Sequence, residues 1–227
     1  ARSGRLAAVQ RRTPLKICAD NPFSINLYSE AGRAAERPVS VVIECDTGQK
    51  RSGVMTPAEV VELAKIIKKD PWLEFGGLMF YPPVNDWSAT QEFLDATNNG
   101  LTDLGLIPEI ISTGGTPNLK NIGYLNGATE HRSGTSIFND RMMMFANVAK
   151  ITDCALTIYT SVVSRAEDSR GILDAGSKTF TSDSGGLDGF GLILEHPKAH
   201  IYKMAEEHGF LDISNCKTKP SIGDVLR

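Results

Sequence analysis

The feature that most constrains the fold is an apolar stretch that runs directly into a charged, glycine-flanked loop. Residues Val39 to Cys45 are mostly apolar and rich in valine, and the next eight residues, 46–53, read DTGQKRSG. A nearly continuous apolar run is typical of a strand covered on both faces, as in a parallel sheet. Thr56 and Pro57 then begin a helix, with Glu59 placed to complete a capping box. Because ligands of α/β folds bind at the loops after such strands, we expect the chemistry of this chain at that loop.

Strands and helices alternate through the first part of the chain, and the pattern then changes. The expected strands of the first part are residues 15–19, 39–45, 73–81 and 108–112, and the expected helices are residues 23–36, 56–69 and 89–106. Beyond about residue 145, short strands joined by turns are expected at residues 155–164, 171–175, 190–195 and 200–203. The sequence therefore predicts an α/β domain at residues 1–148 and a β-rich domain at residues 149–227.

Four β/α units are too few to close a barrel. A closed (β/α)8 barrel takes about 250 residues by itself, whereas the whole chain has 227. On length alone, either the sheet is open or the chain is a fragment of a barrel.

Composition excludes several classes of function. The net charge is −3 and like charges form no block, so we expect no nucleic-acid partner. No apolar run approaches the roughly 20 residues that a membrane-spanning helix needs, and the N-terminus lacks the core of a signal peptide. We therefore expect a cytoplasmic protein without a membrane partner. Cys18, Cys45, Cys154 and Cys216 lie far apart, which favours reduced core thiols over a disulfide or zinc framework.

A second glycine-rich segment lies at Ser112 to Thr116, with the sequence STGGT. Its backbone N–H groups and hydroxyls could bind an anion, and the helical turn that begins at Pro117 would add a favourable dipole. From the residues alone, an ordinary turn remains an alternative. For Arg51, the alternatives to a ligand-binding role are a solvated loop arginine and an arginine paired with Glu44 or Asp46.

Seven segments, taken in order, resemble a known family. They are VVIECDTGQKRSGV at 41–54, GLMFY at 77–81, STGGTPN at 112–118, EHRSGTSIFND at 130–140, ALTIYTSVVSR at 155–165, ILDAGSKTFTSD at 172–183 and EEHGF at 206–210. Together they resemble the D-threonine aldolase and D-serine dehydratase branch of the alanine-racemase-type, fold type III pyridoxal-phosphate enzymes. The resemblance implies the C-terminal half of an alanine-racemase-like (β/α)8 barrel followed by part of a β-rich domain.

The resemblance also implies a site for pyridoxal phosphate. Arg51 corresponds to an arginine that the family holds against the cofactor, and Tyr81 to a ring near the pyridine. The other implied contacts are two phosphate-binding turns, formed by Thr113, Gly114, Gly115 and Thr116 and by Gly134 and Thr135. Ser136 stands where many relatives have tyrosine, so no role of that ring is carried over. We expect the amides of both turns to converge on one anion-sized site, with Arg51 and Tyr81 on the same rim.

The resemblance places two functional groups of the family outside this sequence. The Schiff-base lysine belongs to the first barrel strand, and the metal motif follows the last matching segment, so we expect neither here. Lys50, Lys120 and Lys178 are interpreted as surface charges. Asp183 and His208 are expected at most to support a divalent metal, Mn, Mg or Zn, in the complete protein. The other histidines, His131, His196 and His200, show no metal-ligand spacing and are interpreted as ordinary.

The implied function is that of a pyridoxal-phosphate-dependent lyase that acts, as a homodimer, on a small D-amino acid. It would be an aldolase for D-threonine or another 3-hydroxy-D-amino acid, or a dehydratase of the D-serine type. Because the lysine is missing, the 227 residues alone are expected to be inactive. Two alternatives stay open: a non-catalytic homologue that binds pyridoxal phosphate or phosphate, and an epimerase of the alanine racemase type.

Overall fold

The computed structural model describes residues 2–84 and 86–227 and divides the chain into two compact units, Ala1–Gly134 and Thr135–Arg227. The boundary therefore lies earlier than the 148/149 position expected from the sequence. Helix α5 (Arg141–Phe145) explains the difference, because the Arg141 guanidinium donates to the carbonyl oxygens of Gly189 at 3.0 Å and of Asp188 at 2.8 Å. These bonds attach the residues before position 149 to the second unit.

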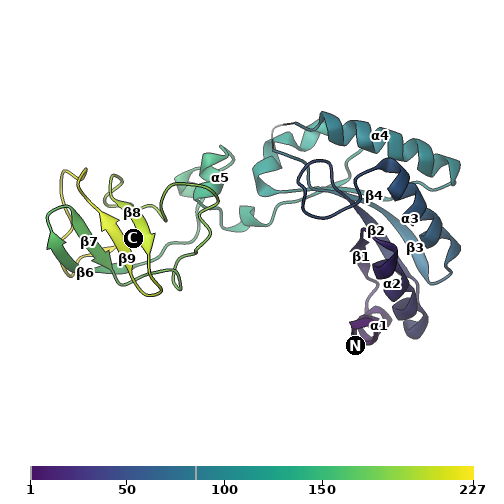
Figure 1. The fold of residues 1–227 in the computed structure, drawn as a ribbon, viewed down its shortest axis with the longest axis horizontal. Helices are drawn as coiled ribbons and strands as arrows, with labels where there is room; N and C mark the ends of the chain where they lie inside the picture. The colour runs from purple at the N-terminus through teal and green to yellow at the C-terminus, as the bar shows by residue number, and fades with distance from the viewer. Residues whose placement is uncertain (1, 85) are drawn as a thin grey trace. The chain divides into compact units, whose positions relative to one another are not determined.

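The first unit contains a five-stranded parallel sheet with the strand order β1-β2-β3-β4-β5 (Figure 1). Its elements are α1 (Arg2–Arg12), β1 (Lys16–Ala19), α2 (Pro22–Ala35), β2 (Val39–Cys45), α3 (Pro57–Lys69), β3 (Leu73–Phe80), α4 (Ser88–Asp103), β4 (Ile110–Gly114), the 3-10 helix η1 (Thr116–Tyr124) and β5 (Glu130–Arg132). Spatial order equals chain order, as in consecutive strands of a (β/α)8 barrel. The expected β/α alternation is confirmed.

Local sequence signals begin two of these helices. Thr56 caps α3, and its hydroxyl and the Glu59 side chain form the predicted capping box. Asn21 caps α2 by accepting from the Ser24 N–H at 2.9 Å. Helix α1 was not expected from the sequence. It packs on α2 through a small hydrophobic cluster that includes Ala7. The contacts that stabilise α1 therefore join segments that are distant in the sequence, and no local signal indicates them.

A single hydrophobic core joins the sheet of the first unit to α2, α3 and α4. In β2, Val39, Val41, Ile43 and Cys45 are buried in this core, whereas Glu44 is only half-buried. The strand is central, between β1 and β3, as expected. Glu44, next to the last residue of the strand, lies at the carboxyl edge where the candidate site is built.

The second unit contains a five-stranded sheet with the order β10-β6-β7-β9-β8, in which every pair is antiparallel. Its elements are the 3-10 helix η2 (Thr135–Ile137), α5, the 3-10 helix η3 (Ile151–Asp153), β6 (Thr160–Glu167), β7 (Arg170–Leu173), β8 (His200–Met204), β9 (Gly209–Asp212) and β10 (Val225–Leu226). Val162, Leu173, Ile201 and Leu211 form much of its core. The expected strand at 190–195 is wrong, because Phe190 forms only an isolated bridge with Ile201.

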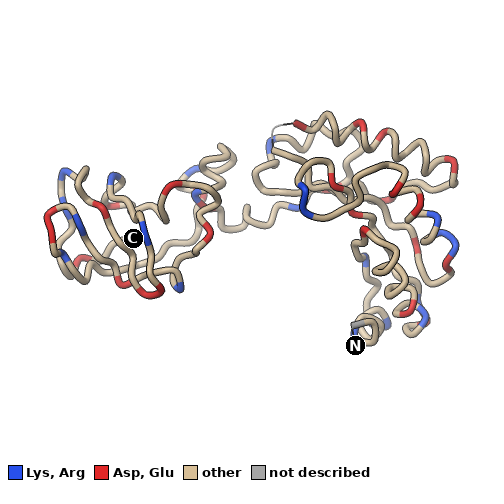
Figure 2. The backbone as a smooth tube through the Cα atoms, viewed as in Figure 1, with Lys and Arg blue, Asp and Glu red and all other residues tan. Residues whose placement is uncertain are grey.

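Charged residues and cysteines are distributed through both units. Figure 2 shows Lys and Arg interspersed with Asp and Glu along the backbone. All four cysteines are free, with Cys45 and Cys216 buried and Cys18 and Cys154 half-buried. Of the helices in the described part of the chain, none has the length and apolar character needed to cross a membrane.

Candidate functional site

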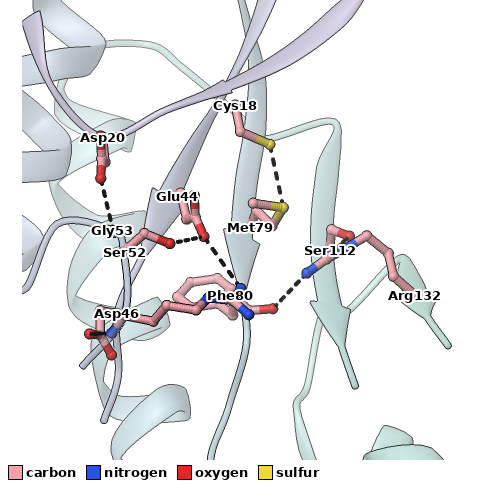
Figure 3. Close-up of polar contacts among 11 residues, drawn as sticks. Cys18, Asp20, Glu44, Asp46, Ser52, Gly53, Met79, Phe80, Ser112 and Arg132 are labelled. Carbon is pink, nitrogen blue, oxygen red and sulfur yellow. Dashed lines mark hydrogen bonds and ion pairs between the residues drawn. The ribbon is translucent and has the colours of Figure 1, made fainter. Parts of the chain in front are cut away.

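The carboxyl ends of the parallel strands bring together side chains from distant parts of the sequence (Figure 3). Glu44 is on β2, Met79 on β3, Ser112 on β4 and Glu130 on β5, and the pairing register places these four in one row. Consecutive strands of a parallel sheet lie about 4.8 Å apart, so residues in one row are neighbours across the sheet. The candidate site is built at this edge, from the last residues of the strands and the loops that follow them.

Arg51 and Tyr81 lie together, as the sequence predicted. The Arg51 guanidinium carbon is 4.9 Å from the centre of the Tyr81 ring. Glu44 Oε1 is 4.0 Å from Arg51 Nη2 and accepts a hydrogen bond from the Ser52 hydroxyl at 2.7 Å. Because the Arg51 side chain is 65% exposed, this ion pair contributes little to stability. The arginine is therefore a cation held over an aromatic ring, with most of its side chain exposed.

Asp46 organises the loop that carries Arg51. Its carboxylate accepts from the N–H of Gly48 at 2.8 Å and from the N–H of Arg51 at 3.2 Å. Burial acts to raise the pKa of the Asp46 carboxyl, but the backbone N–H groups of Gly48, Lys50, Gln49 and Arg51 lower it and leave the pKa below its ordinary value. The loop is thus fixed by an ionised carboxylate at neutral pH.

Replacing Asp46 with alanine is expected to lower the free energy of unfolding by about 1 kcal/mol at neutral pH, because hydrogen bonds to a solvent-accessible carboxylate are lost. The pKa of Asp46 in the folded protein lies below the ordinary 3.8. The carboxylate therefore contributes stability above the pKa of the unfolded state and loses that contribution as the pH falls through the folded-state pKa.

Urea unfolding of the wild type and Asp46→Ala, measured at neutral pH and at a pH below the folded-state pKa, checks this expectation. The difference in unfolding free energy should shrink toward zero in acid. A difference that stays constant with pH would show that the aspartate acts through packing rather than through its charge.

The glycine turn after β4 lies directly against Tyr81. Gly115 has φ of +102°, and a Cβ added there would lie 2.9 Å from both Cζ and Oη of Tyr81. A Cβ on Gly114 would lie 2.7 Å from Arg132 Nη2. Gly115 is therefore favoured both by its positive φ and by the close approach of the Tyr81 ring, whereas a side chain at Gly114 would require the end of Arg132 to move.

One part of the expected anion site is wrong. The N–H of Gly115 donates to the carbonyl oxygen of Arg132 at 2.9 Å, which continues the β4–β5 ladder by one residue. This amide is therefore committed within the sheet and does not face a ligand. The Thr113 hydroxyl is engaged as well, since it lies 2.8 Å from Nδ1 of His131 and the residue is fully buried. Thr116, which begins η1, is also buried, at 3% exposure.

His131 has a structural task at this turn that the sequence did not indicate. Its Nε2 lies 3.1 Å from the carbonyl oxygen of Gly115, and its Nδ1 contacts the Thr113 hydroxyl. With Nε2 as the donor to the carbonyl and Nδ1 as the acceptor from the hydroxyl, the neutral imidazole satisfies both contacts. The ring thereby ties the turn after β4 to β5.

Arg132 is the site residue that sequence reasoning missed. Its Nη1 donates to the Ser112 hydroxyl and its Nη2 to the carbonyl oxygen of Phe80 at 3.1 Å, so it spans β3, β4 and β5. Burial lowers the pKa of this guanidinium, and the nearby Cys18, Glu130 and Glu44 partly offset that effect. The available signal is its place two residues before Gly134 and Thr135, the second phosphate-binding turn that the resemblance implies.

Gly134 and Thr135 are both exposed and belong to different units. Their convergence with the turn at Gly114 to Thr116 therefore stays a prediction.

Asp183 and His208 are exposed residues of the second unit. Asp183 accepts from the Gly185 N–H at 2.9 Å and lines a cavity of about 580 Å³ that is formed by residues 139–227 alone. Within residues 2–84 and 86–227, no group of three His, Cys, Asp or Glu side chains could hold a metal ion. The support that Asp183 and His208 would give to a metal of the complete protein stays a prediction. Lys178 is exposed and pairs with Glu206 at 3.1 Å.

Comparison with known proteins identifies two family models. The model of the alanine racemase N-terminal domain matches residues 2–141. The model named "Putative serine dehydratase domain" matches residues 155–227.

Two curated proteins align with nearly the whole chain. A D-threonine aldolase from Arthrobacter sp. is 27% identical over 244 residues, which cover 99% of this chain and 61% of the relative. A 3-hydroxy-D-aspartate aldolase from Paracoccus denitrificans is 27% identical over 256 residues, which cover 100% of this chain and 62% of the relative. The chain thus spans about three fifths of the length of these relatives.

The fold has a close counterpart among solved structures. The crystal structure of a D-threonine aldolase from Filomicrobium marinum superimposes with a TM-score of 0.84 at 24% identity, covering 99% of this chain and 63% of that one. At this identity the match establishes the fold: an alanine-racemase-like barrel segment followed by a β domain.

Proposed function

The chain belongs to the family of the alanine racemase N-terminal domain, and we propose that it is the cofactor-holding part of a pyridoxal-phosphate-dependent lyase acting on a 3-hydroxy-D-amino acid. One observation carries the proposal. At the carboxyl edge of the sheet, a rim arginine lies over Tyr81 while a glycine turn packs against the same ring. The aldolase relatives and the serine dehydratase model support the lyase class.

The residues at this edge fit an aromatic, anionic group. The Arg51 guanidinium lies over Tyr81 and the Arg132 guanidinium lies beside Gly114, and a guanidinium stays protonated under all ordinary conditions. Such cations suit a phenolate or phosphate oxygen. A Cβ at Gly115 would lie 2.9 Å from the Tyr81 ring, so the glycine allows the turn to pack directly against this ring.

Bound pyridoxal phosphate would serve as the electron sink for bond cleavage at the α-carbon or β-carbon of an amino acid. The chain's own residues would orient it. Tyr81 would offer an aromatic face, Arg51 would supply positive charge at the rim, and Arg132 would supply it from β5, where its bonds to Ser112 and Phe80 hold it in place. Asp46 keeps the Arg51 loop in this position.

The proposal is tested by titrating pyridoxal phosphate into the complete protein that carries this chain. The wild type should bind it, and Arg51→Gln should weaken binding about tenfold, which is the loss of one charge-assisted contact of about 1.4 kcal/mol. Arg33→Gln is the matched control, because Arg33 is an exposed arginine at the end of α2. It should bind like the wild type.

Failure of the wild type to bind pyridoxal phosphate would overturn the proposal. Equal affinity of the wild type and Arg51→Gln would remove Arg51 from the site. If the cofactor binds but no 3-hydroxy-D-amino acid is cleaved or dehydrated, a non-catalytic binding protein becomes the better description.

A further inference from the structure

The carbonyl oxygen of Pro82 accepts hydrogen bonds from two side-chain amides. Asn118 Nδ2 donates to it at 3.0 Å, and Gln49 Nε2 donates to it at 3.2 Å. Pro82 directly follows Tyr81, so any constraint on this carbonyl acts on the backbone that carries the Tyr81 ring. None of these contacts involves the ring itself.

Asn118 acts in this arrangement only as a donor. It is fully buried, and its Nδ2 also donates to the carbonyl oxygen of Gly114 at 3.1 Å. Both N–H groups are thereby used, whereas its buried Oδ1 has no hydrogen-bond partner among the described residues. A buried acceptor without a partner is unfavourable, because it has lost its bonds to water. The two bonds that Asn118 donates join the Gly114 turn to the Pro82 loop.

Gln49 adds the third segment. It lies two residues before Arg51 in the loop after β2, and its side chain is exposed. Beside it, a Cβ on Gly48 would lie only 3.1 Å from Cγ of Pro83, so the two loops are in contact there as well. The three segments that meet at the Pro82 carbonyl are the ones that carry Arg51, Tyr81 and the glycine turn.

We propose that Asn118 and Gln49 are positioning residues that hold the Tyr81 ring between Arg51 and Gly115 by fixing the carbonyl of Pro82. The purpose of the positioned ring, as one wall of a cofactor site, rests on the proposed function. The position itself does not, because it can be measured without any ligand.

The direct test uses the complete protein labelled with 3-fluorotyrosine. The chain has five tyrosines, and the fluorine resonance of Tyr81 is assigned by its loss in Tyr81→Phe. In Gln49→Leu and in Asn118→Leu this resonance should shift or broaden, because the ring loses its fixed place beneath the Arg51 charge. Gln49→Leu decides the question if Asn118→Leu does not fold, since Gln49 is exposed.

Asn121→Leu is the matched control. Asn121 is also in η1, and its Nδ2 donates to a carbonyl of the same loop, that of Val84, at 2.7 Å. Because this bond lies farther along the loop from Tyr81, the Tyr81 resonance should not move. An unchanged Tyr81 resonance in Gln49→Leu, or an equal shift in Asn121→Leu, would overturn the inference.

A second readout separates this inference from the proposed function. If pyridoxal phosphate binds to the wild type, Gln49→Leu should weaken its binding about fivefold, the value of one hydrogen bond of about 1 kcal/mol. If the wild type does not bind it but the Tyr81 resonance responds to Gln49→Leu, the proposed function fails while the positioning role stands.

Discussion

Replacing Gly77 with alanine is expected to lower the free energy of unfolding by about 4 kcal/mol, the combined cost of backbone strain and overpacking. Gly77 has φ of +137°, and a Cβ there would lie 2.0 Å from the carbonyl oxygen of Ile110. Gly77 is paired with Ile110 in the β3–β4 ladder, so the neighbour is backbone that cannot rotate away. Relief of this clash would require β4 to move away from β3. The turn that carries Gly114 and Gly115 would then move with β4.

The control for this prediction is Gly127→Ala. Gly127 also has positive φ, +89°, but the nearest atom to an added Cβ is Cδ1 of Ile111 at 3.8 Å. Only backbone strain applies there, so a loss of about 1 kcal/mol is expected. Urea unfolding of both variants measures the difference. Equal losses would show that the β3–β4 contact at Gly77 relaxes at little cost.

Replacing Arg132 with lysine is expected to lower the free energy of unfolding by about 2–3 kcal/mol, although the charge is kept. The guanidinium donates at once to Ser112 on β4 and to the carbonyl of Phe80 on β3. A single ammonium on a flexible stem lacks the fixed fork that serves both. Because Ser112 is 2% exposed, water does not readily replace the lost donor. In the complete protein, affinity for pyridoxal phosphate should fall as well.

Arg33→Lys serves as the control for Arg132→Lys, because Arg33 is an exposed arginine on α2. Its substitution should change the unfolding free energy by no more than about 0.5 kcal/mol. Urea unfolding compares the two. If Arg132→Lys is as stable as the wild type, the guanidinium geometry at β5 is not what joins the three strands.

Local patterns were enough to predict most elements of the first unit. The apolar run at Val39–Cys45 became the central parallel strand β2, and Thr56 with Glu59 formed the capping box that begins α3. Each of these features depends on residues that are close together in the sequence, which is the range over which sequence patterns are informative. The order of the matching motifs also led correctly to the family. It placed Arg51 and Tyr81 on one rim, and the structure confirms that pairing.

The sequence by itself therefore determined the fold class, the family and the strand edge at which the candidate site lies. Only the tertiary structure decided which groups at that edge are free. The Gly115 N–H is taken by the carbonyl of Arg132, and the Thr113 hydroxyl contacts His131. The Arg132 guanidinium donates to the Ser112 hydroxyl and to the carbonyl oxygen of Phe80. Each of these bonds joins segments that are far apart in the chain, and which donor meets which acceptor depends on the register between strands. No pattern within a single segment contains that register.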